Sequence, residues 1–480
     1  MDLLTQSKLS PDEIRILTEI NSRIDKNRAY NHGRREYYEA HQRVKNLAIG
    51  VPPALAAVKV AIGWPGMVVD ALDERLDVRG LVLPGNSDED PMGLRGIFQD
   101  NELDITWQEG HIEALIQGCA FETTSLGDTS AGEPEALITV ESPTSMSGIW
   151  NPRRRLLDAA GAVIRDEDDQ IIGVTLFLPD QTVKVDKDPA TRKWIVTDRQ
   201  VHNIGRPMVR RLVNRSWTSR QWGRSEITRP IIAATDMAMR TLLGAEIARE
   251  FYGAPQRVIL GAEEKTFKDS SGRPTDAWRA YMGRYLALPR DEMTDQTPTV
   301  QQLQGASPTP FIDLIKMAAQ LVAGEAALPP TWLGFVTENP ASADQIRATE
   351  ARHVKRAERR QRTFGAAHRG ALIDAVMLRD GLTEMPDELR DLAIDWVDAA
   401  TPTKAASADA AVKLTQANIL PASSEVTLAS IGLDPTQIAQ IKADQRLDQA
   451  RQALYTRIGQ QAETAKAEDP QVREFADRRT

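Results

Sequence analysis

The spacing of apolar residues changes twice along this chain, and this change constrains the fold more than any other feature of the sequence. Between about residues 62 and 213, short β-like runs alternate with turn residues, whereas the segments on either side are dominated by helical spacing. The runs that predict strands include 66–69, 81–83, 136–140 and 194–196. Because a helix from 110 to about 118 interrupts these runs, the sequence predicts an α+β domain here.

A β-hairpin with an acidic tip is predicted inside this domain. Its strands are 163–165 and 171–177, and its tip is the run of four acids at 166–169. Clustered carboxylates can hold Mg²⁺, as in a metal-dependent nuclease, but four acids in a turn are more typical of a solvated surface. We therefore predict no metal site, and a metal-dependent nuclease stays an alternative function.

The first helix has a clear start signal. Ser10 is a candidate N-cap, Pro11 suits the first helical position, and Glu13 completes a capping box. Ile14, Leu17, Ile20 and Ile24 then recur at helical spacing, so this helix should bury one side.

Two further helices are predicted on either side of a mixed segment. The first runs from 225 to 252, with Pro230 in or near its first turn, and the second from 311 to 327. The apolar side of the second helix is predicted to contain Leu314, Ile315, Ala318, Leu321 and Val322. In the mixed segment, 258–260 and 285–289 predict strands and 275–283 predicts a short helix.

A loop with large apolar side chains follows the second of these helices. The side chains are those of Trp332, Leu333, Phe335 and Val336. Such a loop is either a buried connector or an exposed segment with a function, and the sequence leaves both interpretations open.

The next helix is unusually basic for an acidic protein. It begins at Ser342 and can reach Gly370, and it carries seven cationic side chains against Glu350 and Glu358. The cations are Arg347, Arg352, Lys355, Arg356, Arg359, Arg360 and Arg362. Val354, Ala357 and Phe364 form a stripe that can pack while the arginines point outward. The cations are either a solvated face or contacts to carboxylates or phosphates, for which arginine is well suited.

Composition and missing motifs exclude several classes of protein. A length of 480 residues suggests about three domains, and no run of about 18 apolar residues is present to span a membrane. The single cysteine, Cys119, excludes an internal disulfide and suits a reducing cytoplasm. No phosphate-binding loop, nucleophile elbow or zinc-protease motif occurs, so we predict no catalytic residue, no cofactor and no enzyme activity. The net charge of −9 argues against a tight grip on DNA.

The order of these segments resembles the portal proteins of long-tailed siphoviruses, particularly those of actinobacterial phages. The most specific resemblance is at 327–335, 338–347 and 359–365, which read ALPPTWLGF, ENPASADQIR and RRQRTFG. Supporting motifs are YNHG at 30–33, WNP at 150–152 and FYGAPQR at 251–257, and the resemblance extends from about 10 to 450.

The resemblance implies an α+β fold of several regions, namely wing, stem, clip and crown, with long central helices and a β-rich wing. By order along the chain, the regions are 1–224 wing, 225–252 stem helix, 253–308 clip, 309–327 stem helix, 328–341 tunnel loop, 342–370 long Arg-rich helix, 371–400 wing return, 401–465 crown and 466–480 charged tail.

The resemblance also implies a function. Portal proteins form a ring, usually a dodecamer, at the capsid vertex, which is the conduit for DNA packaging and ejection. The implied partners are double-stranded DNA, the terminase large subunit that hydrolyses ATP, head-completion or neck proteins, and the major capsid or scaffolding protein. The protein would belong to the virion, assemble in the host cytoplasm and need no membrane. A phage DNA-processing enzyme, such as a metal-dependent nuclease, and another minor head protein are the remaining alternatives.

Within that ring, the apolar loop would line the DNA channel and touch DNA without bonds to phosphates. The basic helix would contact neighbouring subunits or DNA. Both roles are expectations that follow from the resemblance.

Overall fold

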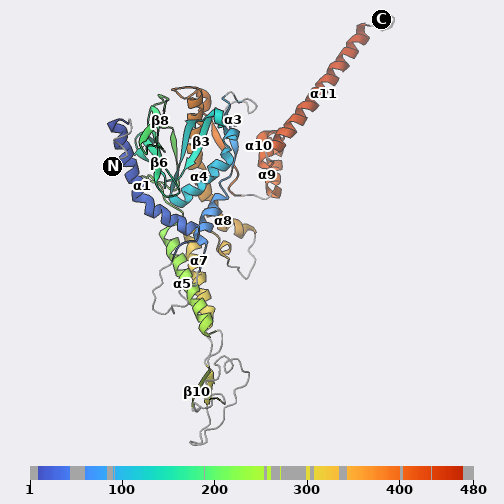
Figure 1. The fold of residues 1–480 in the computed structure, drawn as a ribbon. Helices are drawn as coiled ribbons and strands as arrows, with labels where there is room; N and C mark the ends of the chain where they lie inside the picture. The colour runs from blue at the N-terminus through green and yellow to red at the C-terminus, as the bar shows by residue number, and fades with distance from the viewer. Residues whose placement is uncertain are drawn as a thin grey trace. The chain divides into compact units, whose positions relative to one another are not determined.

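A computed structural model describes most of the chain (Figure 1). The described residues are 9–43, 60–83, 90, 92–188, 190–252, 257–260, 271, 299–302, 307–334, 343–400, 404–433 and 435–468. They divide into two compact units, Met1–Asp77 with Leu81–Ile394, and Val78–Gly80 with Asp395–Thr480.

Helix α1 (Pro11–Tyr38) begins as the sequence predicts. The Ser10 hydroxyl accepts the Glu13 backbone N–H at 3.3 Å, and the Glu13 carboxylate accepts the Ser10 backbone N–H at 2.7 Å. This reciprocal capping box satisfies two N–H groups that the helix itself cannot bond. Leu17, Ile20 and Ile24 are buried, so the predicted apolar side is confirmed.

The buried side of α1 covers a five-stranded antiparallel sheet (Figure 1). The strands lie in chain order: β4 (Met146–Asn151), β5 (Leu156–Arg165), β6 (Ile171–Phe177), β7 (Gln181–Lys187) and β8 (Trp194–Val201). Strands β5 and β6 form the predicted hairpin, in which Val163 lies opposite Val174. Asp169 at its tip forms an ion pair with Arg28 of α1. Among the residues that the structure describes, no three His, Cys, Asp or Glu side chains are grouped to hold a metal ion.

A second, three-stranded sheet has the order β3-β2-β9. Its strands are β2 (Cys119–Leu126), β3 (Ala136–Glu141) and β9 (Val209–Val213). Helices α3 (Leu94–Asp100) and α4 (Leu103–Gln117) precede it, and a 3₁₀ turn (Thr129–Ala131) connects β2 to β3. Helix α4 packs closely on this sheet because Gly110 has no side chain: a Cβ there would lie 2.7 Å from Leu212 Cδ1.

The predicted strand at 66–69 is wrong, because these residues belong to helix α2 (Trp64–Asp73). Pro65 lies in the first turn of this helix, where its missing N–H costs no hydrogen bond. Val68, Val69 and Leu72 are all buried, so the helix is apolar on several sides. A short apolar run of this kind does not distinguish a buried helix from a buried strand.

Helices α5 (Arg229–Tyr252) and α7 (Thr309–Ala326) lie side by side (Figure 1). Ile231, Ala234 and Ala238 of α5 share a core with Ala318 and Val322 of α7. Pro230 is in the first turn of α5, as the sequence predicts. The predicted apolar side of α7 is only partly right, because Leu314 and Leu321 are 45% and 57% exposed.

Between these helices, β10 (Arg257–Leu260) pairs antiparallel with β11 (Thr299–Gln302). The strand predicted at 258–260 is therefore confirmed, while the segments at 275–283 and 285–289 lie outside the described residues.

Helix α7 is followed by a 3₁₀ turn (Pro330–Leu333), helix α8 (Ala343–Arg379) and a second 3₁₀ turn (Asp387–Leu389). Strands β1 (Val78–Val82) and β12 (Ala393–Trp396) form a two-stranded sheet. The second unit continues with helices α9 (Lys404–Gln416), α10 (Glu425–Ser430) and α11 (Pro435–Glu468). In the described part of the chain, no helix is both long and apolar enough to span a membrane.

The mixture of helices and antiparallel sheets confirms the predicted α+β class, with a β-rich region before the long helices α5, α7 and α8.

Candidate functional site

Helix α8 positions the basic residues that the sequence singles out. It is longer than predicted and ends at Arg379, because 371–378 continue as a buried apolar helix. Gly370, the predicted end, lies inside the helix where a Cβ would be 2.9 Å from Arg210 Nε. The missing side chain makes room for Arg210, so the glycine serves packing and does not stop the helix.

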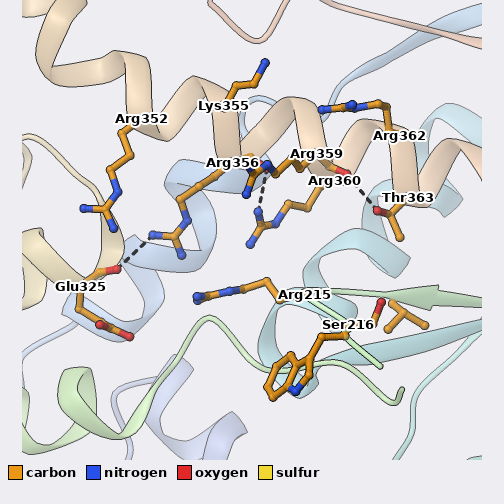
Figure 2. A pocket seen from close by; sticks show the side chains of 12 residues that line it. Arg215, Ser216, Glu325, Arg352, Lys355, Arg356, Arg359, Arg360, Arg362 and Thr363 are labelled. Atoms are coloured by element: carbon orange, nitrogen blue, oxygen red, sulfur yellow. Dashed lines mark hydrogen bonds between the residues drawn. The ribbon is translucent and has the colours of Figure 1, made fainter. Parts of the chain in front are cut away.

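The basic side of α8 faces an open cavity of about 850 Å³, which we call the basic pocket (Figure 2). It lies between α8 and the chain that follows β9. Its lining consists of Val213, Arg215, Ser216, Trp217, Glu325, Arg352, Lys355, Arg356, Arg359, Arg360, Arg362 and Thr363. Seven of these side chains are cationic and one is acidic, so the pocket is suited to anionic groups.

Two of the basic residues do not point outward as predicted. Arg356 and Arg360 are largely buried and form ion pairs with Glu226, which is fully buried. Arg360 Nη2 lies 2.5 Å from Glu226 Oε1, and the Asn214 amide donates to the same oxygen at 3.0 Å. The prediction is wrong for these two arginines because Glu226, more than 100 residues earlier in the sequence, needs buried cations as partners.

The surroundings of Glu226 keep it ionised. Burial alone would raise the pKa of Glu226, but Arg356, Arg360 and Arg215 together with the Asn214 hydrogen bond outweigh it and lower the pKa to about 2. The carboxylate therefore stays negatively charged at neutral pH, and it neutralises part of the positive charge that lines the basic pocket.

Arg356 of α8 also bonds both to the end of α7 and to Glu226, which lies just before α5. Its guanidinium donates to the backbone oxygens of Glu325, at 3.1 Å, and Ala326, which are at the C-terminal end of α7. These carbonyls have no partner within their own helix. Glu226, the ion-pair partner of Arg356, lies three residues before α5 begins. One side chain of α8 thus ties the start of α5 to the end of α7.

The remaining cations of the helix are free to meet a partner. Arg352, Lys355, Arg359 and Arg362 are exposed, and Lys355 pairs with Glu358 of the same helix. Within the described residues, no carboxylate lies within 4.0 Å of the guanidinium of Arg352, Arg359 or Arg362. Arg347 belongs to α8, but its side chain is outside the described part of the structure.

The apolar loop is described only as far as Gly334. Leu333 is buried in the core shared by α5 and α7, and Trp332 packs against the same core. The Trp332 and His353 rings are nearly perpendicular, with their centroids 5.7 Å apart, and the Arg75 guanidinium lies 5.6 Å from the centroid of the Trp332 ring. Leu333 therefore anchors the beginning of the loop. Phe335 and Val336 are outside the described residues, and the channel-lining role of these residues stays a prediction.

A second buried polar cluster, which includes a residue of α8, was not predicted from the sequence. His368 of α8 bonds through Nδ1 to Glu122 of β2, and its Nε2 lies 2.8 Å from Nε2 of His111 in α4. Burial raises the pKa of Glu122 and lowers the pKa values of both histidines. All three side chains are inaccessible to solvent, so this cluster joins α4, β2 and α8 and offers no substrate a way in. No local sequence pattern indicates it, because the partners are 246 and 257 residues apart.

Comparison with known proteins decides the family. The model of a phage portal protein family, described as SPP1 Gp6-like, matches residues 17–451. The chain belongs to the phage portal protein family. It is 34% identical to the portal protein of Mycobacterium phage D29 over 383 residues, which cover 79% of this chain and 77% of that protein. The portal protein of Mycobacterium phage L5 is 33% identical over the same shares.

The match includes both stem candidates, the apolar loop and helix α8, so the portal function predicted from the sequence is confirmed. Portal proteins are structural components of the virion, at the capsid vertex, and no finding favours the nuclease alternative. Among solved structures, a chain from the virion of a native gene transfer agent particle is similar, with a TM-score of 0.42 and 13% identity over 78% of this chain and 90% of that chain. At these values the similarity adds nothing to the family assignment.

Proposed function

We propose that this chain closes into a homo-oligomeric ring at the capsid vertex and that DNA passes through the ring during packaging and ejection. The observation that carries this proposal is the family match over 17–451, which leaves few residues of the chain unmatched. The ring contains about twelve copies in this proposal.

We assign the regions of the ring by their order in the chain. The wing is 1–224, the paired stem helices are 225–252 and 309–327, and the clip is 253–308. The side-by-side packing of α5 and α7, with the paired strands β10 and β11 between them in sequence, supports a stem that carries a clip at its end. The tunnel loop is 328–341, followed by the Arg-rich helix 342–370 and the wing return 371–400. The crown is 401–465 and the charged tail 466–480.

The proposed partners follow from these regions. The clip docks the terminase large subunit during packaging and head-completion or neck proteins afterwards, and the wing contacts the major capsid or scaffolding protein. The ring assembles in the host cytoplasm. The chain itself carries out no catalysis in this proposal, and the ATP hydrolysis that drives packaging belongs to the terminase.

Ring formation is tested on the purified protein. Negative-stain images should show annular particles, and the mass in solution should be about twelve times the 53.1 kDa of one chain. Assembly can depend on the capsid, so the measurement is repeated in the presence of the phage scaffolding protein. Particles that stay monomeric under both conditions would contradict the proposed function.

The apolar loop is proposed to narrow the channel and touch DNA through Trp332, Phe335 and Val336, without bonds that hold phosphates. Phe335→Ala should leave ring assembly intact and reduce the length of DNA retained in the head. Leu333→Ala is the matched comparison, because Leu333 is in the core and its loss should lower thermal stability instead. Normal DNA retention in Phe335→Ala heads would remove the functional role of this side chain.

A further inference from the structure

Two surfaces of the larger unit carry exposed charges of opposite sign. The first is the basic pocket, where the exposed cations Arg352, Arg359 and Arg362 line the same cavity as Trp217. Trp217 is 48% exposed although it is one of the largest apolar side chains in the molecule. An exposed aromatic ring within a charged rim is the usual composition of a protein interface.

The second surface is at the end of α3 and the first turns of α4, and we call it the acidic face. Asp100, Glu102, Asp104 and Glu109 are exposed there around Ile105, which is 56% exposed. Positions 104, 105, 108 and 109 lie on one side of α4 because of the helical repeat. Counting described residues only, none of these four carboxylates has a cation within 4.0 Å.

We propose that the basic pocket of one copy receives the acidic face of the next copy, with Trp217 and Ile105 as the apolar anchors of the contact. Each copy presents both surfaces, so the contact is head-to-tail and repeats from copy to copy. The proposal rests on the ring proposed above and names the surfaces that build it. The exposed aromatic and aliphatic anchors would be covered by the same contact that pairs the charges.

The helix already binds carboxylates in this way. Arg356 and Arg360 hold Glu226 on the inner side of the pocket, so their neighbours one turn away have the same chemistry directed outward. Each copy carries 68 acidic side chains against 59 basic ones, so a neighbouring copy offers an excess of carboxylates.

DNA phosphates are the less suitable partner for these cations. Each phosphate that a cation neutralises strengthens binding, and several such contacts on every copy of a ring would hold the duplex tightly. A conduit needs the opposite property, because the duplex has to slide. Carboxylates of a neighbouring copy satisfy the cations and leave the channel without this grip.

The proposal is tested by charge reversal. Arg352→Glu with Arg359→Glu, and separately Asp100→Lys with Glu109→Lys, place like charges opposite each other, so the protein concentration at which half of the copies are assembled should rise at least about tenfold. Glu102 and Asp104 are left unchanged because an acid at the N-cap or in the first turn also stabilises the helix. When all four substitutions are combined in one chain, the charges are opposite again, and assembly should return to within about threefold of the wild type. Mass photometry at several protein concentrations measures each value.

Two control variants change the net charge by the same amounts elsewhere. Arg153→Glu with Lys193→Glu, and Glu167→Lys with Asp168→Lys, alter exposed side chains that belong to neither surface, and both should assemble like the wild type. A loss of assembly in these controls equal to that in the reversal variants would overturn the proposal, since net charge alone would then explain it.

A cysteine pair gives an independent measurement. Cys119 is buried, so Glu109→Cys with Arg359→Cys introduces the only accessible thiols in the described part of the chain. Mild oxidation of assembled protein should give a ladder of disulfide-linked multimers, whereas either single cysteine should give only dimers or none.

The outcomes separate this contact from the ring itself. If wild-type protein forms no ring with or without scaffold, the proposed function fails. If rings form in the wild type and equally in both reversal variants, or if the four-substitution variant is not rescued, only the pocket-to-face contact is wrong. Rings of Arg352→Glu with Arg359→Glu that assemble normally but retain less DNA would overturn it in favour of phosphate as the partner.

Discussion

At the scale of single residues, Glu226 is the side chain near the basic pocket whose replacement we expect to destabilise the fold most. Its carboxylate is fully buried and is bound by Arg356 and Arg360 from α8, with Arg215 3.5 Å away. Two guanidiniums that are mostly removed from water depend on one negative charge. Removing one partner of a buried ion pair costs more than the pair contributes, because the other charge stays behind without compensation.

We expect Glu226→Gln to lower the free energy of unfolding by roughly 3–5 kcal/mol, which is the usual cost of leaving buried charges unpaired. Urea unfolding at neutral pH measures this value. Glu325→Gln is the matched control, because Glu325 is partly exposed and lies 3.4 Å from Arg224, so it should change stability by less than about 1 kcal/mol. Equal losses in both variants would contradict the special position of Glu226.

The pH dependence of stability should also show the contribution of the Glu226 ion pairs. The pKa of Glu226 is about 2 in the folded protein against a usual value of 4.5. A depressed carboxyl pKa stabilises the fold fully above pH 4.5, and this stabilisation is lost as the pH falls from 4.5 towards 2. It amounts to about 3 kcal/mol. Between pH 6 and pH 3, the free energy of unfolding should therefore fall less steeply in Glu226→Gln than in the wild type. Identical slopes in the two proteins would contradict the assignment.

At the scale of elements, helix α4 is held against the three-stranded sheet at Gly110. A Cβ at this position would lie 2.7 Å from Leu212 Cδ1 and 3.1 Å from Val140 Cγ1, so the helix is closer to the sheet than a side chain at position 110 would allow. A glycine inside a helix normally weakens it, and here the close packing explains why the residue is present.

Gly110→Ala should therefore destabilise the protein by about 1–3 kcal/mol, because the helix has to move away from the sheet. Gly33→Ala in α1 is the control, since nothing lies within 4 Å of a Cβ there, and it should raise stability by roughly 0.5–1 kcal/mol. Thermal unfolding of the two variants should shift in opposite directions. A stabilised Gly110→Ala protein would show that the contact is looser than described.

Elements with a local signal could be predicted, and those that depend on distant partners could not. Ser10, Pro11 and Glu13 specify the start of α1 by themselves, and the hairpin of β5 and β6 follows from two apolar runs around a turn. The helix at 64–73 was missed because its apolar residues face neighbours on several sides, which removes the helical stripe. The positions of Arg356 and Arg360 depend on Glu226, and the sequence around α8 contains no sign of that residue.

At the scale of the whole molecule, the second unit contains the long helix α11, which has an exposed apolar stripe. Leu447, Leu454 and Ile458 of α11 are each more than half exposed, and their spacing of seven and four residues places them on one side of the helix. An exposed apolar stripe on an otherwise polar helix is a usual site for contact with another chain.

Replacing Leu447, Leu454 and Ile458 by Ser should weaken self-association by about threefold to tenfold, because three apolar contacts are lost per copy. The free energy of unfolding of the larger unit should stay unchanged, since it is a separate compact unit. Gln445, Gln449 and Gln452 are on the other side of α11, and their replacement by Ser is the control for lost helix propensity. Sedimentation velocity over a concentration series measures association, and unchanged association in the apolar variant would contradict the prediction.

The joint at Arg356 has a mechanical consequence. In the proposed channel, a duplex that pulls on the loop before α8 would load that helix, in which Arg356 binds the last carbonyls of α7 and the carboxylate three residues before α5. Force entering at the loop would then be divided among three helices before it reaches the three-stranded or the five-stranded sheet. The rigidity of this ion-pair cluster would then limit how far the channel wall moves as the DNA passes.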